Sequence, residues 1–178
     1  MSNTEGTTEP EYTGPTLPLE QALNLTFASG VGAWGTVMTL CPDGTFFGDF
    51  SDSEMGVVEE DYPNGIRWIC SFSGAFEDFV QVDANIYKLT LTHIETANAE
   101  GQEWIEDGVK YIAAGPYGLQ DGTEFYLYLP STPVDAISEE MLSWWPDRFG
   151  SEEGTPTTLG RYGLYNAATG HTFFSAKQ

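Results

Sequence analysis

The sequence predicts an all-β protein, an antiparallel up-and-down barrel of about eight strands with one short helix before the last two strands. Apolar residues recur at every second position in many short segments, which is the period of a half-buried strand. The chain also holds 20 glycines and 10 prolines, enough to supply many turns. Consecutive strands without crossover helices pair antiparallel, and a long meander closes to remove its edges. A two-sheet sandwich is the alternative.

The length and composition predict one folded domain. The chain has 178 residues, 40% of them hydrophobic, which is sufficient for a single full core. Residues 1–16 are polar and lack apolar periodicity, so we expect a flexible acidic tail there. The single β-barrel domain is expected to cover residues 17–178.

Alternation places the first strands. Leu23 and Phe27 begin and end the first alternating segment, and residues 34–51 predict a β-hairpin. Its turn is Pro42-Asp43-Gly44, because Asp-Gly adopts the positive φ that tight hairpins require. Residues 52–65 are expected to form a loop that carries five carboxylates.

The later elements follow from the same pattern. Further strands are expected at residues 66–76, 87–93, 109–114, 125–129, 159–165 and 172–176. Residues 95–108 are polar and predict a loop or a short helix. One helix is expected after Ser138, a good N-cap, and Pro146 ends it.

Strand parity predicts that the two cysteines are unpaired. Cys70 shares the inward face of Trp68 and Phe72, whereas Cys41 shares the outward face of its own strand. A disulfide needs Cβ atoms about 3.5–4.5 Å apart, which opposite faces forbid without a bulge. A bulge beside Pro42 would allow the alternative.

The charge balance excludes several partners. Asp and Glu number 27 against six Lys and Arg, a formal net charge of −21, which repels nucleic acid and anionic headgroups. Such a surface suits the cell exterior. No apolar run predicts a transmembrane segment. Residues 1–16 resemble the stub that follows the lipid-anchoring cysteine of exported bacterial lipoproteins, so we expect an exported protein, at the cell surface or secreted, with a lipid anchor upstream as one option.

No motif predicts catalysis, and neither a cofactor nor a metal is expected. The chain lacks a nucleophile elbow, a P-loop and a dinucleotide fingerprint. Asp49, Asp52 and Glu54 lie close in sequence, but their spacing does not match an EF-hand, and a solvated acidic loop is the expectation. His93 is expected on an inward strand face, as a hydrogen-bonded core residue rather than a ligand.

Two short segments resemble lipocalin-like barrels. Gly32-Ala33-Trp34-Gly35 is similar to the glycine-x-tryptophan start of that family, and Arg161 is similar in position to its late basic residue. The resemblance implies that Trp34 lies near one barrel end with Arg161 over its ring, in a cation–π contact.

A second resemblance extends along most of the chain. It is to uncharacterised exported, lipoprotein-like β-rich proteins of Gram-positive gut bacteria, and it implies export and β structure but no established activity. The segments that carry it are Pro42–Phe46, Gly48–Phe50, Tyr62–Gly65, Phe72–Gly74, Asp107–Ile112, Pro116–Leu119 and Tyr162–Asn166.

Aromatic residues in the predicted loops indicate where a ligand would bind. Trp104, Trp144, Trp145 and Tyr117 fall in long insertions or at the helix end, where such rings grip apolar or sugar ligands. We therefore expect a non-enzymatic binding protein for a small apolar or carbohydrate ligand. The alternative is a structural or protein-interaction module whose barrel is filled.

Overall fold

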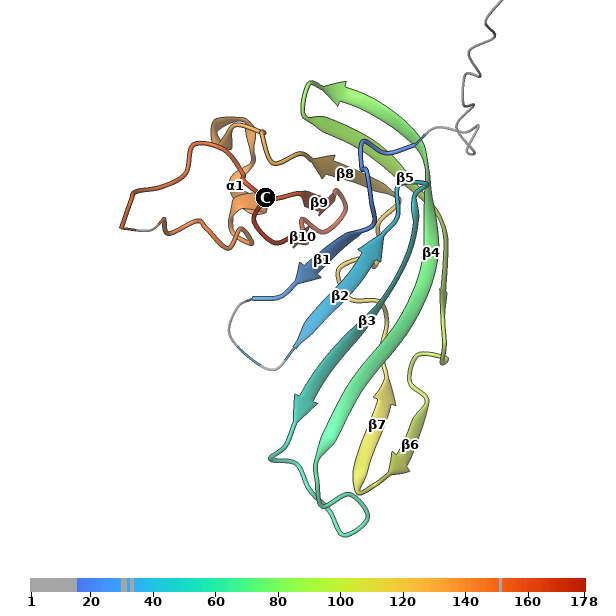
Figure 1. Cartoon of the computed structure of the whole chain (residues 1–178). Coiled ribbons are helices and arrows are strands. Elements are labelled where there is room, and N and C mark those ends of the chain that lie inside the picture. The colour runs from blue at the N-terminus through green and yellow to red at the C-terminus, as the bar shows by residue number, and fades with distance from the viewer. Residues whose placement is uncertain (1–15, 30–31, 33, 151) are drawn as a thin grey trace, which may run out of the picture.

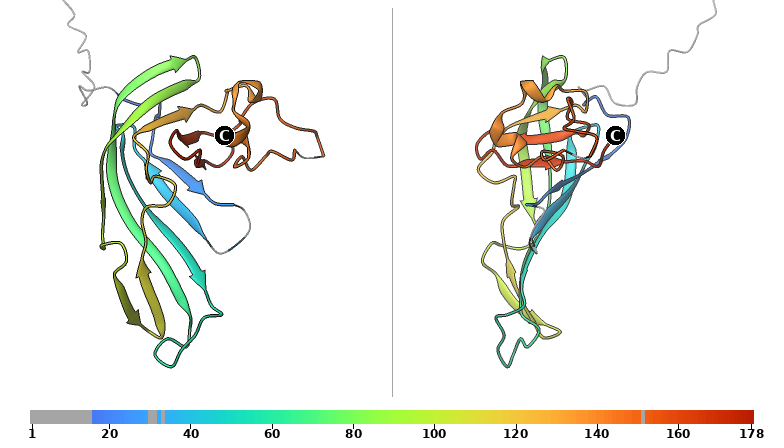
Figure 2. Two further views of the ribbon diagram at one scale, coloured as in Figure 1. Left: turned by 180° about the vertical axis from the view of Figure 1, so that it is seen from behind. Right: turned by 90° about the vertical axis from the view of Figure 1, so that its left-hand side faces the viewer.

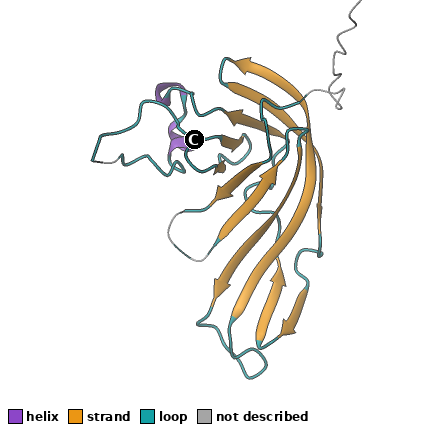
Figure 3. Ribbon diagram, in the orientation of Figure 1, coloured by secondary structure: helices purple, strands orange, loops and turns teal. Residues whose placement is uncertain are grey.

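The computed structural model describes residues 16–29, 32, 34–150 and 152–178, so most of the expected tail lies outside the described residues. The regular secondary structure of this part is almost entirely strand, with a 3-10 turn and one short helix (Figure 3). The elements are β1 (Leu23–Phe27), β2 (Gly35–Leu40), β3 (Thr45–Glu54), β4 (Ile66–Asp83), β5 (Ile86–Thr96), β6 (Glu103–Glu106), β7 (Val109–Ala113), β8 (Glu124–Tyr128), η1 (Val134–Ala136), α1 (Glu139–Leu142), β9 (Gly163–Asn166) and β10 (Thr172–Phe174).

Eight of these strands close an antiparallel barrel, as the alternating pattern predicts. β1 to β5 and then β8 to β10 pair in that order, and β10 returns to β1 through Thr26 opposite Phe174. The helix α1 precedes the last two strands, and the Ser138 side chain caps it by accepting from the Met141 N–H. The turn at Asp43-Gly44 has the expected positive φ at Gly44, 91°.

The strand β6 departs from the prediction of a loop or helix at residues 95–108, whereas β7 confirms the strand predicted at residues 109–114. Asp107 and Gly108 take φ angles of 51° and 77°, which is the geometry of a two-residue hairpin turn. β7 then pairs parallel to the first part of β4, from Ile66 opposite Lys110 to Ile69 opposite Ala113. As a result the sheet of β3, β4, β7 and β6 extends well beyond β8, β9 and β10 (Figures 1 and 2).

A β-bulge in β5 reverses the expected direction of His93. Ala75 pairs with His93 but Phe76 pairs with Leu91, so Thr92 is an extra residue. The inserted residue shifts the alternation, and the His93 side chain is 61% exposed beside Glu95. The expectation of an inward His93 is therefore wrong.

The middle of the barrel is filled by side chains. The rings of Phe76 and Phe125 lie 5.1 Å apart, and Phe46 lies 4.9 Å from Phe76. Leu89 and Leu127 are fully buried beside them. Close packing of this kind leaves the ends of the barrel, rather than its centre, as places for a ligand.

A second apolar cluster attaches α1 to the outside of the last strands. Trp145 is buried there with Met141 and Leu159, and its indole N–H donates to the Leu159 carbonyl at 3.1 Å. The cluster fixes the helix against the barrel, so α1 is not a free lid.

Both cysteines are free, as strand parity predicts. Cys70 is buried in the barrel core, and burial raises the pKa of its thiol to about 11. Cys41 is partly exposed at the end of β2.

Among the described residues, no helix has the length and apolar character needed to cross a membrane.

Candidate functional site

Aromatic rings close the barrel at the end where β1 stops and β2 starts. Phe27 lies at the centre of this group, with Trp34 at 5.1 Å, Trp144 at 4.8 Å and Tyr117 at 5.4 Å between ring centroids. His171 stacks on Phe27 at 4.9 Å. We call these five residues the aromatic plug.

His171 sits in the plug without a polar partner. Its Nδ1 is buried and is the one such side-chain atom in the described part of the chain that lacks a hydrogen bond. Burial lowers the pKa of His171, and the Glu140 carboxylate only partly opposes this shift. Burial in the plug therefore favours the neutral form of the His171 imidazole.

The segment that follows β7 crosses this end of the barrel and is held by Asn166. The Asn166 side-chain amide is buried and donates to the carbonyls of Gly118 and Gln120, each at 3.0 Å. Its oxygen accepts from the Ala168 N–H at 3.0 Å. Gly118 has φ +100°, and an added Cβ would lie 2.7 Å from the Phe173 ring, so only glycine fits.

An open cleft lies beyond the plug. It consists of two adjoining hollows of about 410 and 470 Å³, which share three lining residues. We call it the end cleft, and it is lined by Trp34, Phe50, Asp52, Ser53, Glu54, Trp68, Glu100, Ala114, Gly115, Tyr117 and Gln120. Each hollow falls in the usual size range of small-molecule sites.

The extended sheet supplies one wall of the end cleft. Phe50, Asp52 and Glu54 alternate on β3, so all three face inward, and Asp52 pairs directly opposite Trp68. Trp68 is half-buried and stacks on no other aromatic ring of the described residues. Its ring packs partly against the barrel core and lines the hollow, and its indole N–H has no hydrogen-bond partner among them.

The plug supplies the other wall. Tyr117 makes edge contacts with Trp34 at 5.2 Å and with Phe50 at 5.6 Å. These rings are held by one another and by the Thr36 hydroxyl, which donates to the Tyr117 carbonyl at 2.8 Å. The aromatic walls are thus formed before any ligand arrives.

The end cleft is lined by carboxylate side chains that have no basic residue beside them. Asp52, Glu54 and Glu100 form no ion pair with any described residue. All six basic residues of the chain lie in its described part, and none of them lines the cleft. A carboxyl-lined hollow without a basic residue disfavours anionic ligands.

Asp49, Asp52 and Glu54 are close in sequence, but their side chains do not all lie on the same face of β3. Asp49 has the outward parity of β3 and accepts a hydrogen bond from the Ser71 hydroxyl, whereas Asp52 and Glu54 face inward. Among the described residues, no group of three or more His, Cys, Asp or Glu side chains is placed to hold a metal ion.

The residues predicted to bind ligand separate into three places. Tyr117 and Trp144 meet in the plug together with Trp34, and Tyr117 also lines the end cleft. Trp145 is buried in the second apolar cluster. Trp104 stacks on Tyr111 at 5.5 Å, on the face of the extended sheet opposite to Trp68.

Arg161 does not form the expected cation–π contact with Trp34. Its guanidinium donates to the Asp147 carboxylate at 2.8 Å and to the Ser175 carbonyl at 2.9 Å. The hydrogen bonds from Arg161 to the Asp147 carboxylate lower the pKa of Asp147, and Lys177 lowers it further. Arg161 thus ties the segment after α1 to the end of β10.

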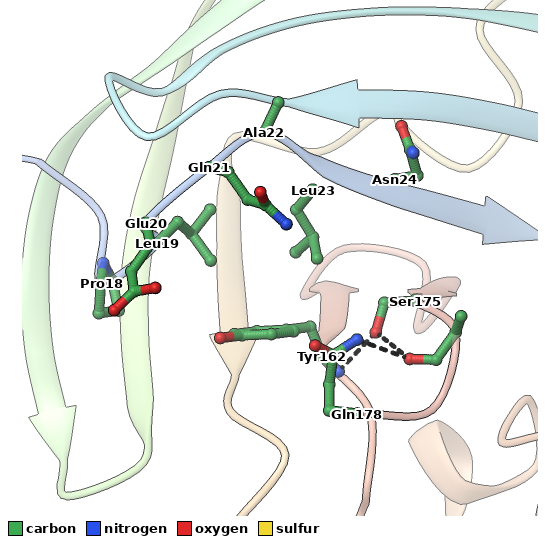
Figure 4. A pocket seen from close by; sticks show the side chains of 11 residues that line it. Pro18, Leu19, Glu20, Gln21, Ala22, Leu23, Asn24, Tyr162, Ser175 and Gln178 are labelled. Atoms are coloured by element: carbon green, nitrogen blue, oxygen red, sulfur yellow. Dashed lines mark hydrogen bonds between the residues drawn. The ribbon is translucent and has the colours of Figure 1, made fainter.

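A larger hollow of about 520 Å³ lies where β1 and β10 diverge (Figure 4). Segment 18–24 forms one side of it, and Tyr162, Ser175 and Gln178 form the other. The Ser175 hydroxyl accepts from the Tyr162 N–H and donates to Ala176, and Gln178 also donates to Ala176. The polar groups of Ser175 and Gln178 are thus used within the chain, and the hollow offers one aromatic ring against four in the end cleft.

Asp52 and Trp68 line the cleft although the sequence pattern does not mark either as a site residue: Asp52 begins the predicted loop 52–65, and Trp68 shares the inward face of a predicted strand. The informative signal is on β3, where the inward positions change from Phe46 and Phe50 to Asp52 and Glu54. Acids at inward positions of a strand indicate that the strand has left the core and borders a cleft.

The fold is a closed eight-stranded antiparallel barrel with an aromatic, acidic cleft at one end. No protein-family model matches the chain, and comparisons with curated proteins and with solved structures return no match. The resemblances to lipocalin-like barrels and to exported proteins of Gram-positive gut bacteria therefore stay predictions.

Proposed function

We propose that this protein is a non-enzymatic binding protein that takes a small ligand with an apolar face into the end cleft. The observation that carries the proposal is a cleft of two adjoining hollows, one lined by Trp68 and the other by Trp34 and Tyr117, whose rings already contact each other. Rings bind apolar faces, including the C–H faces of sugars, while the indole N–H, the Gln120 amide and the carboxylates bind hydroxyl groups. The packed barrel centre supports a site at the end rather than in the lumen.

The proposal is tested with neutral probes and a matched pair of variants. We expect n-octyl β-D-glucoside or maltohexaose to quench tryptophan fluorescence saturably, and Trp68→Leu to abolish that binding. Trp104→Leu is the control, because it removes the same ring from the opposite face of the same sheet. Trp104→Leu should therefore bind like the parent protein.

The result that contradicts the proposal is equally specific. Saturable binding that survives Trp68→Leu and is lost in Trp104→Leu would place the site on the other face. If neither a neutral nor a charged small probe binds at the cleft, the result favours the alternative, a structural or protein-interaction module with a filled barrel. Export to the cell surface and a lipid anchor stay predictions of the sequence.

A further inference from the structure

We infer that the preferred ligand of the end cleft is an organic cation, an ammonium group with an apolar body. The inference rests on the proposed function of the same cleft and adds the charge of the ligand. It follows from the placement of carboxylates beside aromatic rings, in a hollow that no basic residue lines.

The rings, rather than the carboxylates, distinguish this cleft from the rest of an acidic surface. With 27 Asp and Glu residues in the chain, a carboxylate alone indicates nothing. A cation over an aromatic face is attracted by the negative face of the ring, and tryptophan is the strongest such partner. Trp68 offers a face that no other ring of the described residues covers.

The carboxylates lie where an ammonium on that face would meet them. Asp52 is directly opposite Trp68 in the β3–β4 ladder, so the two side chains are adjacent on the inward face. Glu100 lines the adjoining hollow, where its Oε2 lies 3.4 Å from the place of an added Cβ on Gly115. A ligand ammonium seated on Trp68 would therefore have Asp52 beside it and a second carboxylate in the adjoining hollow.

Among the described residues, no basic side chain lines the cleft to compensate these groups. Lys110 lies over the Tyr62 ring at 5.4 Å and pairs with Glu103 at 3.5 Å, and Arg161 is engaged with Asp147. The net charge of −21 adds a long-range field that concentrates cations near the surface. A neutral sugar would use the rings and leave the carboxylates without a counter-charge.

The test compares choline with 3,3-dimethylbutan-1-ol, its uncharged isostere with carbon in place of nitrogen. We expect choline to bind about tenfold more tightly, which corresponds to about 1.4 kcal/mol. We also expect its affinity to fall with added sodium chloride while that of the isostere stays constant. Binding is followed by tryptophan fluorescence and by the indole signals of the NMR spectrum.

A double variant separates the cleft carboxylates from the overall charge. Asp52→Asn with Glu100→Gln should weaken choline about fivefold and leave the isostere unchanged. The control, Glu77→Gln with Asp78→Asn, removes the same charge about 30 Å away along β4 and should leave both affinities nearly unchanged.

The failures of the two proposals differ. If the isostere binds as tightly as choline, or if both double variants weaken choline equally, the inference of a cationic ligand is overturned and the cleft remains a binding site. If octyl glucoside binds and choline does not, the inference is again overturned. If no probe binds at the cleft, the proposed function itself fails.

Discussion

Replacing Asn166 by alanine tests whether the segment that closes the barrel end is held as described. The side chain is buried and makes three hydrogen bonds, two to carbonyls of the crossing segment and one to the Ala168 N–H. A buried hydrogen bond contributes about 1 kcal/mol, and its loss leaves the partner unsatisfied, so we expect Asn166→Ala to cost about 3 kcal/mol. The melting temperature should then fall by roughly 6–12 °C.

Urea unfolding followed by circular dichroism measures this loss, and Asn64→Ala is the matched control. The exposed Asn64 side chain donates to the Asp107 carbonyl, so its removal should cost less than about 1 kcal/mol. Asn166→Ala should also weaken binding at the end cleft, because Tyr117 and Gln120 belong to the segment it holds. A cost for Asn166→Ala no larger than that for Asn64→Ala would refute this account of the barrel end.

Three further predictions concern the plug and the core. Burial lowers the pKa of His171 below its ordinary 6.5, so its contribution to stability is fully present above that pH and is lost as the pH falls. We therefore expect the melting temperature to fall more steeply between about pH 7.5 and about pH 5.5 in the parent than in His171→Phe. Thiol titration of the unfolded, unreduced chain should count two free thiols, and a count of zero would mean a disulfide. In the folded protein, Cys41 should react well before Cys70, because the pKa of the Cys70 thiol is raised to about 11. Gly118→Ala should lower the free energy of unfolding by at least about 2 kcal/mol, because the added Cβ meets two phenylalanine rings. Gly154 has a similar φ and open space around it, so Gly154→Ala should cost only about 1 kcal/mol. Equal losses in urea unfolding would count against this packing.

The barrel itself could be predicted because local patterns agree with it. Alternation marks the strands, and the turn at Asp43-Gly44 behaves as its chemistry requires, whereas α1 ends at Leu142, before the Pro146 that was expected to end it. The strand β7 follows the predicted pattern, but β6 is missed although Asp107-Gly108 is a strong hairpin signal, because β6 is only four residues long and two of them are acidic. Tertiary pairing with β4, rather than local propensity, stabilises the two strands.

The site was harder to predict than the fold because it depends on faces and register. The bulge at Thr92 reverses His93, and no local pattern announces such an insertion. Trp144 and Trp145 are neighbours in sequence, yet one joins the plug and the other a separate core. Trp68 looks like a core residue until β3 is seen to carry acids past the end of the barrel.

The central claim is that ligand binds on the inward face of the extended sheet, between Trp68 and the plug. The chain has five tryptophans, so a ¹H–¹⁵N spectrum of the indole groups gives five reporters at known places. On titration with choline, the Trp68 and Trp34 signals should shift together and saturate. The signals of Trp104 on the opposite face and of Trp145, bonded to Leu159, should stay in place. Saturable shifts at Trp104 with Trp68 unmoved, or no saturable shift at any indole with choline or octyl glucoside, would contradict the account.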